Sequence, residues 1–215
     1  TPEPSERCRV LYVSPLKALA YDVDRNLRAP LSGIASEAAR LGEEPPSITV
    51  GMRTGDTPPK DRQAMLRKPP DILITTPESL YLMLTSQARE VLATVETVII
   101  DEIHSVAGTK RGSHLALSLE RLDALGDAPP QRIGLSATQR PLETIAEFLG
   151  GGTPSGDDWT ARDVTVVDAP RDRTLDVEII VPVSDMTNPA ADAPPGESDP
   201  ARRPICAAMY PQLLD

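Results

Sequence analysis

Val98-Ile99-Ile100-Asp101-Glu102-Ile103-His104 is the stretch that indicates the fold most strongly. Its first half is an apolar, β-branched run, which is typical of a strand buried on both faces of a parallel sheet. The run ends in Asp101 and Glu102, which places two carboxylates at the carboxyl end of the strand, where ligands bind in open α/β sheets. In an extended chain these side chains point to opposite faces. One can therefore hold a metal ion while the other orients a water molecule, as phosphoryl transfer requires.

Similar short apolar runs recur along the chain and alternate with helical patterns. Strands are predicted at 8–13, 47–52, 71–75, 97–101 and 132–136. Helices are predicted at 17–31, 58–67, 78–84, 113–125 and 142–149. Strand–helix alternation at this pitch predicts βαβ units, and therefore an α/β fold in which helices cover both faces of a parallel sheet.

The last third of the chain has a different character. Residues 150–158 are Gly-rich and polar and predict a surface loop, and strands are expected to resume at 163–168 and 175–183. Residues 187–204 predict a linker or a flexible insertion, and residues 205–214 predict a helix. We therefore expect one domain over 1–169 and the start of a second domain over 170–215.

Composition and charge restrict the class of protein. No stretch approaches ~18 consecutive apolar residues, which excludes a membrane span, and nothing resembles a signal peptide. Cys8 and Cys206 have no Cys or His partner at ligand spacing, so we expect buried thiols in a reducing cytoplasm. The net charge is −10; residues 1–70 carry 11 Lys and Arg against 9 Asp and Glu, and residues 71–215 carry 11 against 23. Any contact with nucleic acid therefore cannot depend mainly on a basic surface.

Three Ser-Pro or Thr-Pro pairs mark predicted helix starts, at 14–15, 57–58 and 76–77. Each places a capping hydroxyl before a proline at the first helical position. The pairs at 14–15 and 76–77 directly follow a strand, so their free backbone N–H groups are expected along the carboxyl edge of the sheet. Helix N-termini of this kind bind phosphates. For each pair alone a simple helix cap is the favoured interpretation, and the alignment of several pairs on one edge strengthens the case for phosphate binding.

Structural roles are also open for the acidic stretch. Asp101 and Glu102 can cap the following helix instead of binding a ligand. His104 is expected on a short loop or turn, where a polar residue with satisfied hydrogen bonds is the simplest interpretation. His114 is expected on a helix surface.

The order of five segments resembles that of superfamily 2 helicases. Ser-Pro-Leu-Lys-Ala-Leu-Ala at 14–20, Thr-Gly-Asp-Thr at 54–57 and Thr-Thr-Pro-Glu-Ser-Leu at 75–80 look like motifs Ia, Ib and the Thr-Pro-Glu element that follows. Asp-Glu-Ile-His at 101–104 and Ser-Ala-Thr at 136–138 look like motifs II and III. The match covers roughly 8–150. Residues 101–122 and 134–141 carry a narrower resemblance to the Lhr (large helicase-related) family of bacterial DNA helicases.

The resemblance implies a RecA-like sheet of the P-loop NTPase type, with ATP and Mg²⁺ as cofactors. It implies that Asp101 holds Mg²⁺ and that Glu102 orients or deprotonates the attacking water. His104 would link the nucleotide site to Ser136 and Thr138, which relay the nucleotide state to the nucleic acid.

The resemblance also implies a strand-binding edge of eight residues: Ser14, Pro15, Lys17, Thr54, Gly55, Thr76, Pro77 and Glu78. Such contacts mostly reach phosphate and sugar, so little base specificity is expected. Lys110 and Arg111 fall in the Lhr-like run, where a solvated surface is an equal interpretation.

One part of the family pattern is missing from the sequence. No Gly-x-x-x-x-Gly-Lys-Ser/Thr phosphate loop occurs, and the arginine-bearing motifs of a second motor domain are also missing. We therefore expect a truncated RecA-like domain that is an internal piece of a longer polypeptide, in preference to evolutionary loss of the loop.

The resulting hypothesis is part of an ATP-dependent 3′-to-5′ DNA helicase or translocase, acting on single-stranded DNA and on DNA or RNA–DNA duplexes, with a role in DNA repair. Its partners would include the remaining helicase domains of the same polypeptide, and these residues alone are expected not to hydrolyse ATP. One alternative is a non-catalytic module that binds nucleic acid or protein. A metal-dependent hydrolase is a weaker alternative. It requires Asp101, Glu102 and His104 to bind one ion, and three ligands so close together at one strand end can hardly converge on it.

Overall fold

The computed structural model describes residues 7–137, 141–156 and 158–168. The chain divides into two units, Thr1–Val167 and Asp168–Asp215. The predicted strand at 175–183, insertion at 187–204 and helix at 205–214 lie outside the described residues. The assignment of a second domain from residue 170 therefore stays a prediction.

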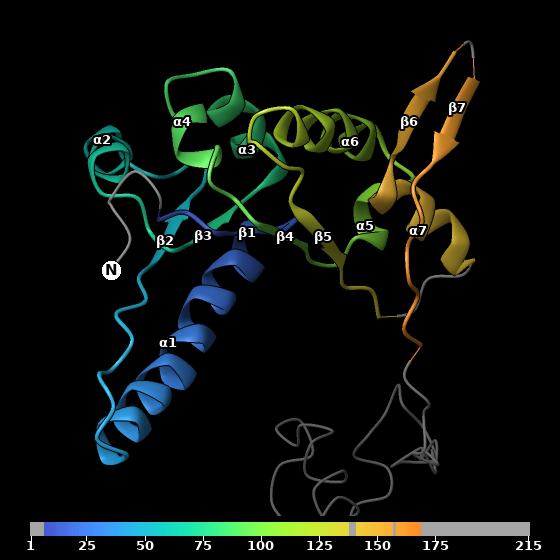
Figure 1. Ribbon diagram of the computed structural model, residues 1–215. Helices are drawn as coiled ribbons and strands as arrows, with labels where there is room; N and C mark the ends of the chain where they lie inside the picture. Colours follow the sequence, from blue (N-terminus) through green and yellow to red (C-terminus); the bar gives the residue numbers. More distant parts are fainter. Residues whose placement is uncertain (1–6, 138–140, 157, 169–215) are drawn as a thin grey trace, which may run out of the picture. The chain divides into compact units, whose positions relative to one another are not determined.

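The centre of the first unit is a parallel sheet of five strands in the order β2-β3-β1-β4-β5 (Figure 1). The strands are β1 (Val10–Val13), β2 (Val50–Arg53), β3 (Ile72–Thr75), β4 (Thr97–Ile100) and β5 (Gln131–Gly134). Each overlaps a predicted strand, so the parallel α/β prediction is confirmed. The register aligns Val13 with Thr75 and Ile100, which brings the carboxyl ends of β1, β3 and β4 level.

Helices lie on both faces of this sheet. They are α1 (Lys17–Arg40), α2 (Pro59–Arg67), α3 (Pro77–Leu84), α4 (Arg89–Leu92), α5 (His104–Ala107), α6 (Lys110–Asp123) and α7 (Leu142–Gly150). Helix α1 extends to Arg40, beyond its predicted end at residue 31, and contains Pro30. The residues after Pro30 include several strong helix formers, so one lost backbone hydrogen bond does not end the helix. The short helices α4 and α5 were not predicted.

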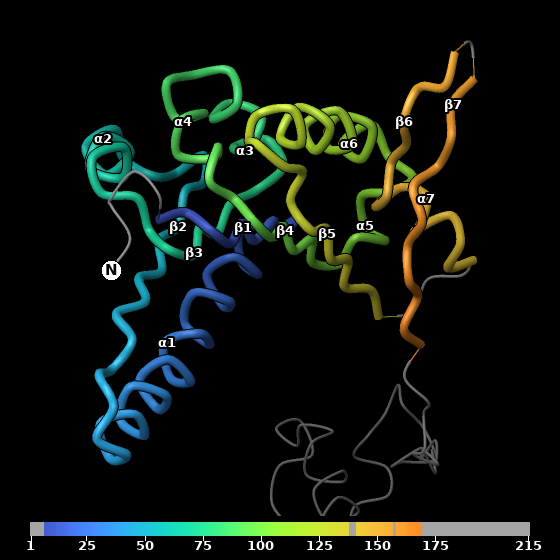
Figure 2. Tube along the Cα trace, in the orientation of Figure 1, coloured from blue at the N-terminus to red at the C-terminus, as the bar shows by residue number. Residues whose placement is uncertain are grey.

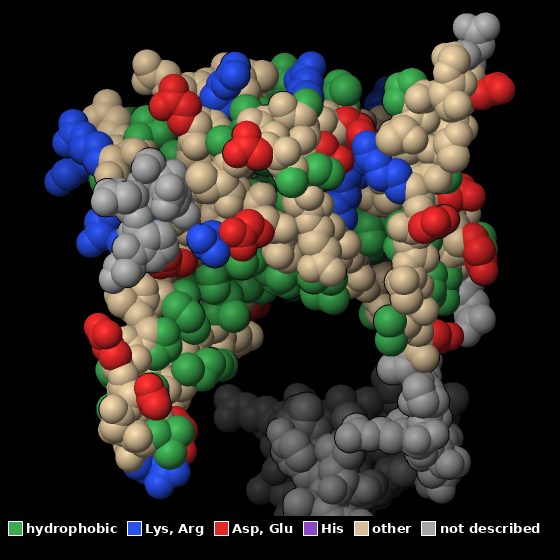
Figure 3. Space-filling model, viewed as in Figure 1, with side chains coloured by type: hydrophobic (Ala, Val, Ile, Leu, Met, Phe, Trp, Pro, Cys, Tyr) green, Lys and Arg blue, Asp and Glu red, His purple; other side chains and the backbone are tan. Residues whose placement is uncertain are grey.

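The hydrophobic core lies between the sheet and the pair α3 and α6. Strand residues Leu11, Leu73 and Val98 are fully buried against this layer, and Leu80 and Leu115 from the two helices complete it. On the opposite face α1 contacts β2 and β3. Figure 3 shows hydrophobic side chains gathered along this second face, next to α1. Because the fully buried core residues lie on the side of α3 and α6, these two helices supply most of the apolar burial that holds the sheet.

The predicted surface loop at 150–158 is a hairpin instead. Strand β6 (Gly152–Ser155) pairs antiparallel with β7 (Asp158–Ala161), and Figure 2 shows the hairpin beside α7. The turn into β6 passes through Gly151 at φ 62°, a left-handed conformation that glycine adopts readily. A small, polar composition suits a hairpin as well as a loop, and only the pairing distinguishes them.

The strand predicted at 163–168 is wrong. These residues have no regular secondary structure. Val164 packs against the core cluster, whereas Val166 and Val167 are exposed, so the apolar pattern of this segment does not correspond to a strand.

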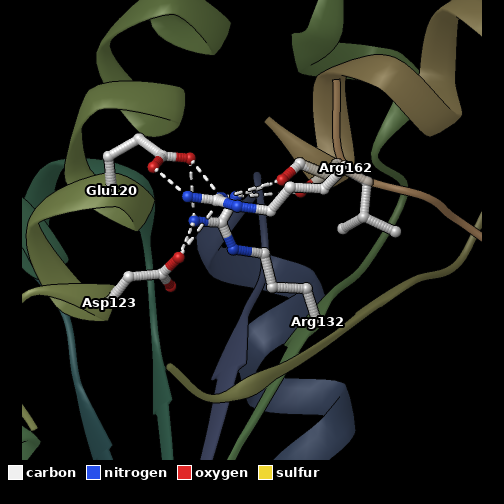
Figure 4. Close-up of polar contacts among 6 residues, drawn as sticks. Glu120, Asp123, Arg132 and Arg162 are labelled. Carbon is white, nitrogen blue, oxygen red and sulfur yellow. Dashed lines mark hydrogen bonds and ion pairs between the residues drawn. The ribbon is translucent and has the colours of Figure 1, made fainter. Parts of the chain in front are cut away.

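A cluster of ion pairs attaches the segment after the hairpin to α6 and β5 (Figure 4). Arg132 Nη2 donates to Glu120 Oε1 at 2.9 Å and to Asp123 Oδ2 at 2.7 Å, and its side chain is only 8% exposed. Arg162 donates to both oxygens of Glu120 at 2.8 Å. Burial raises the pKa of Glu120, but the bonds from Arg162 and Arg132 outweigh it, and the pKa lies below its ordinary value.

Two further expectations concern cysteine and the membrane. Cys8 is a buried free thiol, as predicted, and burial raises its pKa to about 12; Cys206 lies outside the described residues. Within the described part of the chain, every helix is too short or too polar to cross a bilayer.

Candidate functional site

The polar segments that follow β1, β3 and β4 begin at one edge of the sheet. Backbone hydrogen bonds continue the sheet pairing past the strand ends: Ser14 N donates to Thr75 O, and Asp101 N donates to Val13 O, each at 2.9 Å. The next strand along behaves in the same way, since Leu135 N donates to Ile100 O at 2.9 Å. The predicted gathering of these segments at the carboxyl edge is therefore observed.

Asp101 and Glu102 form the start of a tight turn and not the end of an extended strand. Strand β4 ends at Ile100, and residues 101–103 turn, with Glu102 at φ 44°. The prediction that the two carboxylates point to opposite faces of an extended chain is therefore wrong. A left-handed conformation is uncommon for a residue with a side chain and costs of order 1–3 kcal/mol, and such positions cluster at functional sites.

Local hydrogen bonds hold this turn in place. Glu102 N donates to Asp101 Oδ1 at 3.0 Å, and Ile103 N donates to Leu135 O at 3.0 Å. Helix α5 then begins at His104 with Ile103 at its N-cap, so neither carboxylate is the N-cap residue of this helix. The capping alternative is thus not what the structure shows, and both carboxylates are half-buried at the sheet edge.

His104 connects the acidic turn to the end of β5. Its Nδ1 lies 3.1 Å from Ser136 Oγ and 3.4 Å from Glu102 Oε2. His104 begins the short helix α5, whereas a loop or turn was predicted at this position. The structure thus brings together three of the predicted catalytic residues, whereas Thr138 lies outside the described residues. The catalytic roles of these residues and of Asp101, five in all, stay predictions.

Tyr12 belongs to the site but was not predicted from the sequence. It lies on β1 beside Ile99 of β4, and its phenol lies near the Asp101 carboxylate. Burial, followed by the interaction with Asp101, raises the pKa of the Tyr12 phenol well above its ordinary value, so the phenol is protonated at neutral pH. Only the order of the strands reveals this neighbour, because 89 positions separate Tyr12 from Asp101 in the sequence.

The residues around Asp101 suit Mg²⁺ better than a metal held entirely by protein. Within the described residues, no three His, Cys, Asp or Glu side chains are close enough to hold an ion together. The metal-dependent hydrolase alternative requires such a cluster. Mg²⁺ instead retains several waters and is bound through one or two carboxylates together with substrate phosphates, a donor set that the half-buried Asp101 carboxylate fits.

The eight residues predicted for the strand-binding edge divide into two groups. All lie in the segments that follow β1, β2 and β3. Lys17, Gly55 and Glu78 are exposed. The others are buried: Ser14, Pro15, Thr54, Thr76 and Pro77. The exposed residues and the backbone therefore form the surface of this edge.

The buried hydroxyls of this edge shape its loops. Ser14 Oγ donates to Leu16 O at 3.2 Å, and Asp56 N donates to Thr54 Oγ1 at 3.3 Å. Thr54 N in turn donates to Thr57 Oγ1 at 2.9 Å. These hydroxyls are engaged within the protein, so their part in any ligand contact is to fix the conformation of the backbone around them.

One of the three predicted Pro-associated caps is confirmed. Thr76 is the N-cap of α3, accepting from Ser79 N, and Pro77 is the first helical residue. Helix α1 begins at Lys17, with Leu16 at its N-cap, so Ser14 is not a cap. Helix α2 begins at Pro59; Pro58 precedes another proline and is held extended, which moves the start one residue beyond the predicted position.

Two ion pairs cross the strand-binding edge. Lys17 Nζ donates to Asp56 Oδ1 at 2.7 Å, joining the segments after β1 and β2. Arg111 Nε donates to Glu78 Oε1 at 2.6 Å, joining α6 to α3. Arg111 is therefore a surface residue, as one interpretation had it, but it is also paired with a residue of the predicted site.

Comparison with known proteins agrees with this geometry. The DEAD/DEAH box helicase family matches residues 3–147. The chain is 62% identical over 186 residues to the "Lhr helicase/ probable uracil glycosylase" of Mycolicibacterium smegmatis, covering 86% of this chain and 12% of that protein. It is 60% identical over 178 residues to the "Lhr helicase/uracil glycosylase" of Escherichia coli, covering 83% of this chain and 11% of that protein. The chain thus spans about an eighth or less of these two relatives.

A solved structure gives the same result for the fold. The structure of Mycobacterium smegmatis helicase Lhr bound to ssDNA and AMP-PNP superposes with a TM-score of 0.74 at 54% identity, over 98% of this chain and 25% of that one. The predicted RecA-like sheet and the resemblance to Lhr are both confirmed. With its family match, its sheet and its Asp-Glu-Ile-His turn, this chain belongs to the DEAD/DEAH box helicase family.

Proposed function

We propose that this chain supplies the water-activating half of an ATP site, together with a single-stranded DNA-binding edge, to the first motor domain of an ATP-dependent DNA helicase. In this proposal residues 1–169 belong to the first motor domain and residues 170–215 begin the second. The observation that carries the proposal is the cluster at the carboxyl edge of the sheet, where Glu102, His104 and Ser136 lie within hydrogen-bonding distance or close to it.

Each residue of the cluster has a distinct role in the proposed site. Asp101, whose Oδ1 accepts a hydrogen bond from Glu102 N, would hold Mg²⁺. When bound, Mg²⁺ neutralises charge that develops on the β- and γ-phosphates. Glu102 would accept a hydrogen bond from the attacking water and orient it. His104 lies against both Glu102 and Ser136, which would make the position of the Glu102 carboxylate depend on the segment that follows β5.

The phosphate-binding half of the site has to come from other residues. The sequence contains no Gly-x-x-x-x-Gly-Lys-Ser/Thr loop, and that loop supplies the backbone N–H groups and the lysine that hold the phosphates. We therefore propose that residues 1–215 alone do not hydrolyse ATP, and that activity needs the rest of the motor.

The nucleic-acid partner proposed is single-stranded DNA, held mainly through its backbone. The Lhr structure that this chain resembles is described as bound to ssDNA and AMP-PNP, which supports this ligand. We also propose 3′-to-5′ movement, unwinding of DNA or RNA–DNA duplexes, a role in DNA repair and a cytoplasmic location. The proposed binding of single-stranded DNA rests on residues of this chain. The other properties are proposed from the family resemblance.

The decisive experiment is Glu102→Gln in the full-length protein. The substitution keeps the size of the side chain but removes the carboxylate, so ATP hydrolysis stimulated by single-stranded DNA should fall by roughly 100-fold or more, as for loss of a general base. Binding of a fluorescent ATP analogue should remain. Glu96→Gln is a matched control, because Glu96 lies just before the same strand, at its other end, and it should leave the activity unchanged.

Two results would count against the proposal. Unchanged hydrolysis in Glu102→Gln would refute the assignment of the catalytic residue. Absence of both hydrolysis and nucleotide binding in the unsubstituted full-length protein would favour the alternative of a non-catalytic binding module.

A further inference from the structure

Arg111, which the motif comparison left without a role, contacts two separate segments of the strand-binding edge. Its Nε donates to Glu78 Oε1 at 2.6 Å and its Nη2 donates to Glu78 Oε2 at 3.2 Å. The same Nη2 donates to the backbone carbonyl of Pro15 at 2.8 Å. A forked guanidinium that binds both oxygens of a carboxylate is stronger and better oriented than a single ion pair. One side chain of α6 thus joins the segment after β1 to the first turn of α3.

The start of α6 is held rigidly, so the position of Arg111 is well defined. Thr109 is the N-cap of this helix: its Oγ1 accepts from Gly112 N at 3.2 Å and donates to Val106 O at 2.7 Å. Gly112 is buried and its Cα lies so close to the carbonyl of Val106 that a Cβ there would overlap it. The first turn of α6 is therefore fixed against α5, which follows the Asp101–Glu102 turn directly.

Further along, α6 remains paired with α3. The rings of Tyr81 and His114 meet edge to face with centroids 4.4 Å apart, and the guanidinium of Arg121 lies 5.7 Å from the centroid of the Tyr81 ring. The pair of Arg111 and Glu78 is thus the end of a continuous α3–α6 contact, at the edge where the predicted strand-binding residues lie.

Glu78 on its own would be unfavourable at this edge. Its side chain is 55% exposed, and an ionised carboxylate repels the phosphates of a nucleic-acid backbone. The hydrogen bond from Arg111 lowers the pKa of Glu78, so Glu78 is ionised at neutral pH, and the guanidinium offsets its negative charge. The same guanidinium also donates a hydrogen bond to the Pro15 carbonyl, which fixes the backbone of the segment after β1.

We propose that Arg111 is a positioning residue of the strand-binding edge, which neutralises Glu78 and holds Pro15 so that a phosphodiester backbone can approach. This inference rests on the proposed DNA-binding function. It assigns Glu78 a different part from the direct strand contact expected from the resemblance: Glu78 holds Arg111 in place and does not itself contact the strand.

The test compares four variants of the full-length protein by their affinity for a fluorescent oligothymidylate, measured by anisotropy at low and moderate salt. Arg111→Ala should weaken binding on the order of tenfold, the effect of losing a hydrogen bond between charged groups. Glu78→Gln alone should bind as tightly as the unsubstituted protein or a few-fold more tightly. The double variant Arg111→Ala/Glu78→Gln should recover most of the lost affinity, because the uncompensated charge is gone. Arg111→Lys should be intermediate, since lysine keeps the charge but not the fork.

Arg121→Ala is the matched control, because it removes an arginine from the same helix at a site away from the strand-binding edge, and it should leave affinity unchanged. A thermal unfolding curve for each variant identifies losses that come from misfolding. Recovery in the double variant is the readout that a purely structural role would not produce.

Three outcomes distinguish the proposed DNA-binding function from the proposed role of Arg111. If the unsubstituted protein does not bind the oligonucleotide, the proposed function fails. If it binds and Arg111→Ala binds equally well, the inference about Arg111 is overturned. If Arg111→Ala and the double variant are equally weak, Arg111 contacts the strand directly or supports the fold, and the neutralising role is overturned.

Discussion

His104 Nδ1 and Ser136 Oγ lie 3.1 Å apart at the ends of β4 and β5. The two residues are separated by 32 positions and come together because β4 and β5 are neighbours in the sheet. Which of these two groups donates the hydrogen bond depends on the tautomer of His104. It connects the Asp101–Glu102 turn, where water would be activated, to the segment that follows β5.

Replacing Ser136 with alanine should weaken this connection without removing the nucleotide site. A neutral hydrogen bond contributes ~0.5–1.5 kcal/mol, so the maximal rate of ATP hydrolysis with saturating single-stranded DNA should fall roughly two- to tenfold in the full-length protein. Affinity for an ATP analogue should be unaffected. Ser105→Ala is the control, because Ser105 is exposed on α5 next to His104. An equal fall in both variants would contradict a specific role for Ser136.

Replacing Asp56 with asparagine should tighten the binding of single-stranded DNA. Asp56 pairs with Lys17 at 2.7 Å, and the exposed lysine has to exchange this carboxylate for a phosphate when a strand binds. An exposed ion pair is worth ~0.2–1 kcal/mol, which corresponds to a gain in affinity of at most roughly fivefold. The gain should shrink as salt is added.

Asp127→Asn provides the comparison for this prediction. It removes one negative charge from an exposed loop ahead of β5, at the amino end of the strands. Identical gains in the two variants would show that net charge, and not release of Lys17, controls the affinity.

Replacing Gly112 with alanine should destabilise the domain. The added methyl group would overlap the carbonyl oxygens of Val106 and Ala107, which are backbone atoms and cannot rotate away. Overpacking of this kind typically costs ~1–3 kcal/mol, measurable as a lower denaturant midpoint for the full-length protein. Gly108→Ala tests the same connection at a position with open space around it and an ordinary φ of −85°. Comparable losses at both glycines would contradict the steric explanation.

Replacing Arg132 with alanine should be the most destabilising of these changes. It leaves Asp123, whose side chain is only 12% exposed, without its shortest ion pair, and it removes one of the two arginines that pair with Glu120. Breaking a buried ion pair by removing one partner costs ~3–5 kcal/mol, although Arg162 would retain part of the interaction with Glu120. Arg28→Ala, which breaks an exposed pair with Asp24 on α1, should cost ~0.5 kcal/mol or less.

The same cluster predicts how stability depends on pH. The pKa of Glu120 is lower in the folded chain than its ordinary value, so folding favours the ionised form. The stabilisation is present above the ordinary carboxyl pKa of about 4.3 and is lost as the pH falls below it and through the lowered pKa of the folded state. Denaturant midpoints measured from neutral to acid pH should therefore fall less steeply for Arg132→Ala than for the unsubstituted protein, and parallel curves would contradict this.

Local sequence patterns determined most of the architecture. The five central strands were predicted because each is a short apolar run, and the helices α1, α2, α3, α6 and α7 because their apolar residues recur with a period of about 3.6. The Thr76-Pro77 cap was predicted for the same reason, since the hydroxyl bonds a backbone group three residues away. The order of polar motifs after the strands also placed Asp101, Glu102 and the strand-binding segments at one edge, because parallel strands end there together.

Tertiary structure alone decided the details that join these elements. The left-handed turn at Glu102 is held by a hydrogen bond from Ile103 N to the carbonyl of Leu135, just after β5. The hairpin at 152–161 depends on strand pairing, which composition does not distinguish from a loop. Tyr12 meets Asp101, and Arg111 meets Glu78 and Pro15, because the strand order makes neighbours of residues far apart in the chain. The sequence by itself therefore determined the strands, the helices and the chemistry at the strand ends. Long-range packing decided how these side chains pair, since no local period encodes a contact between distant segments.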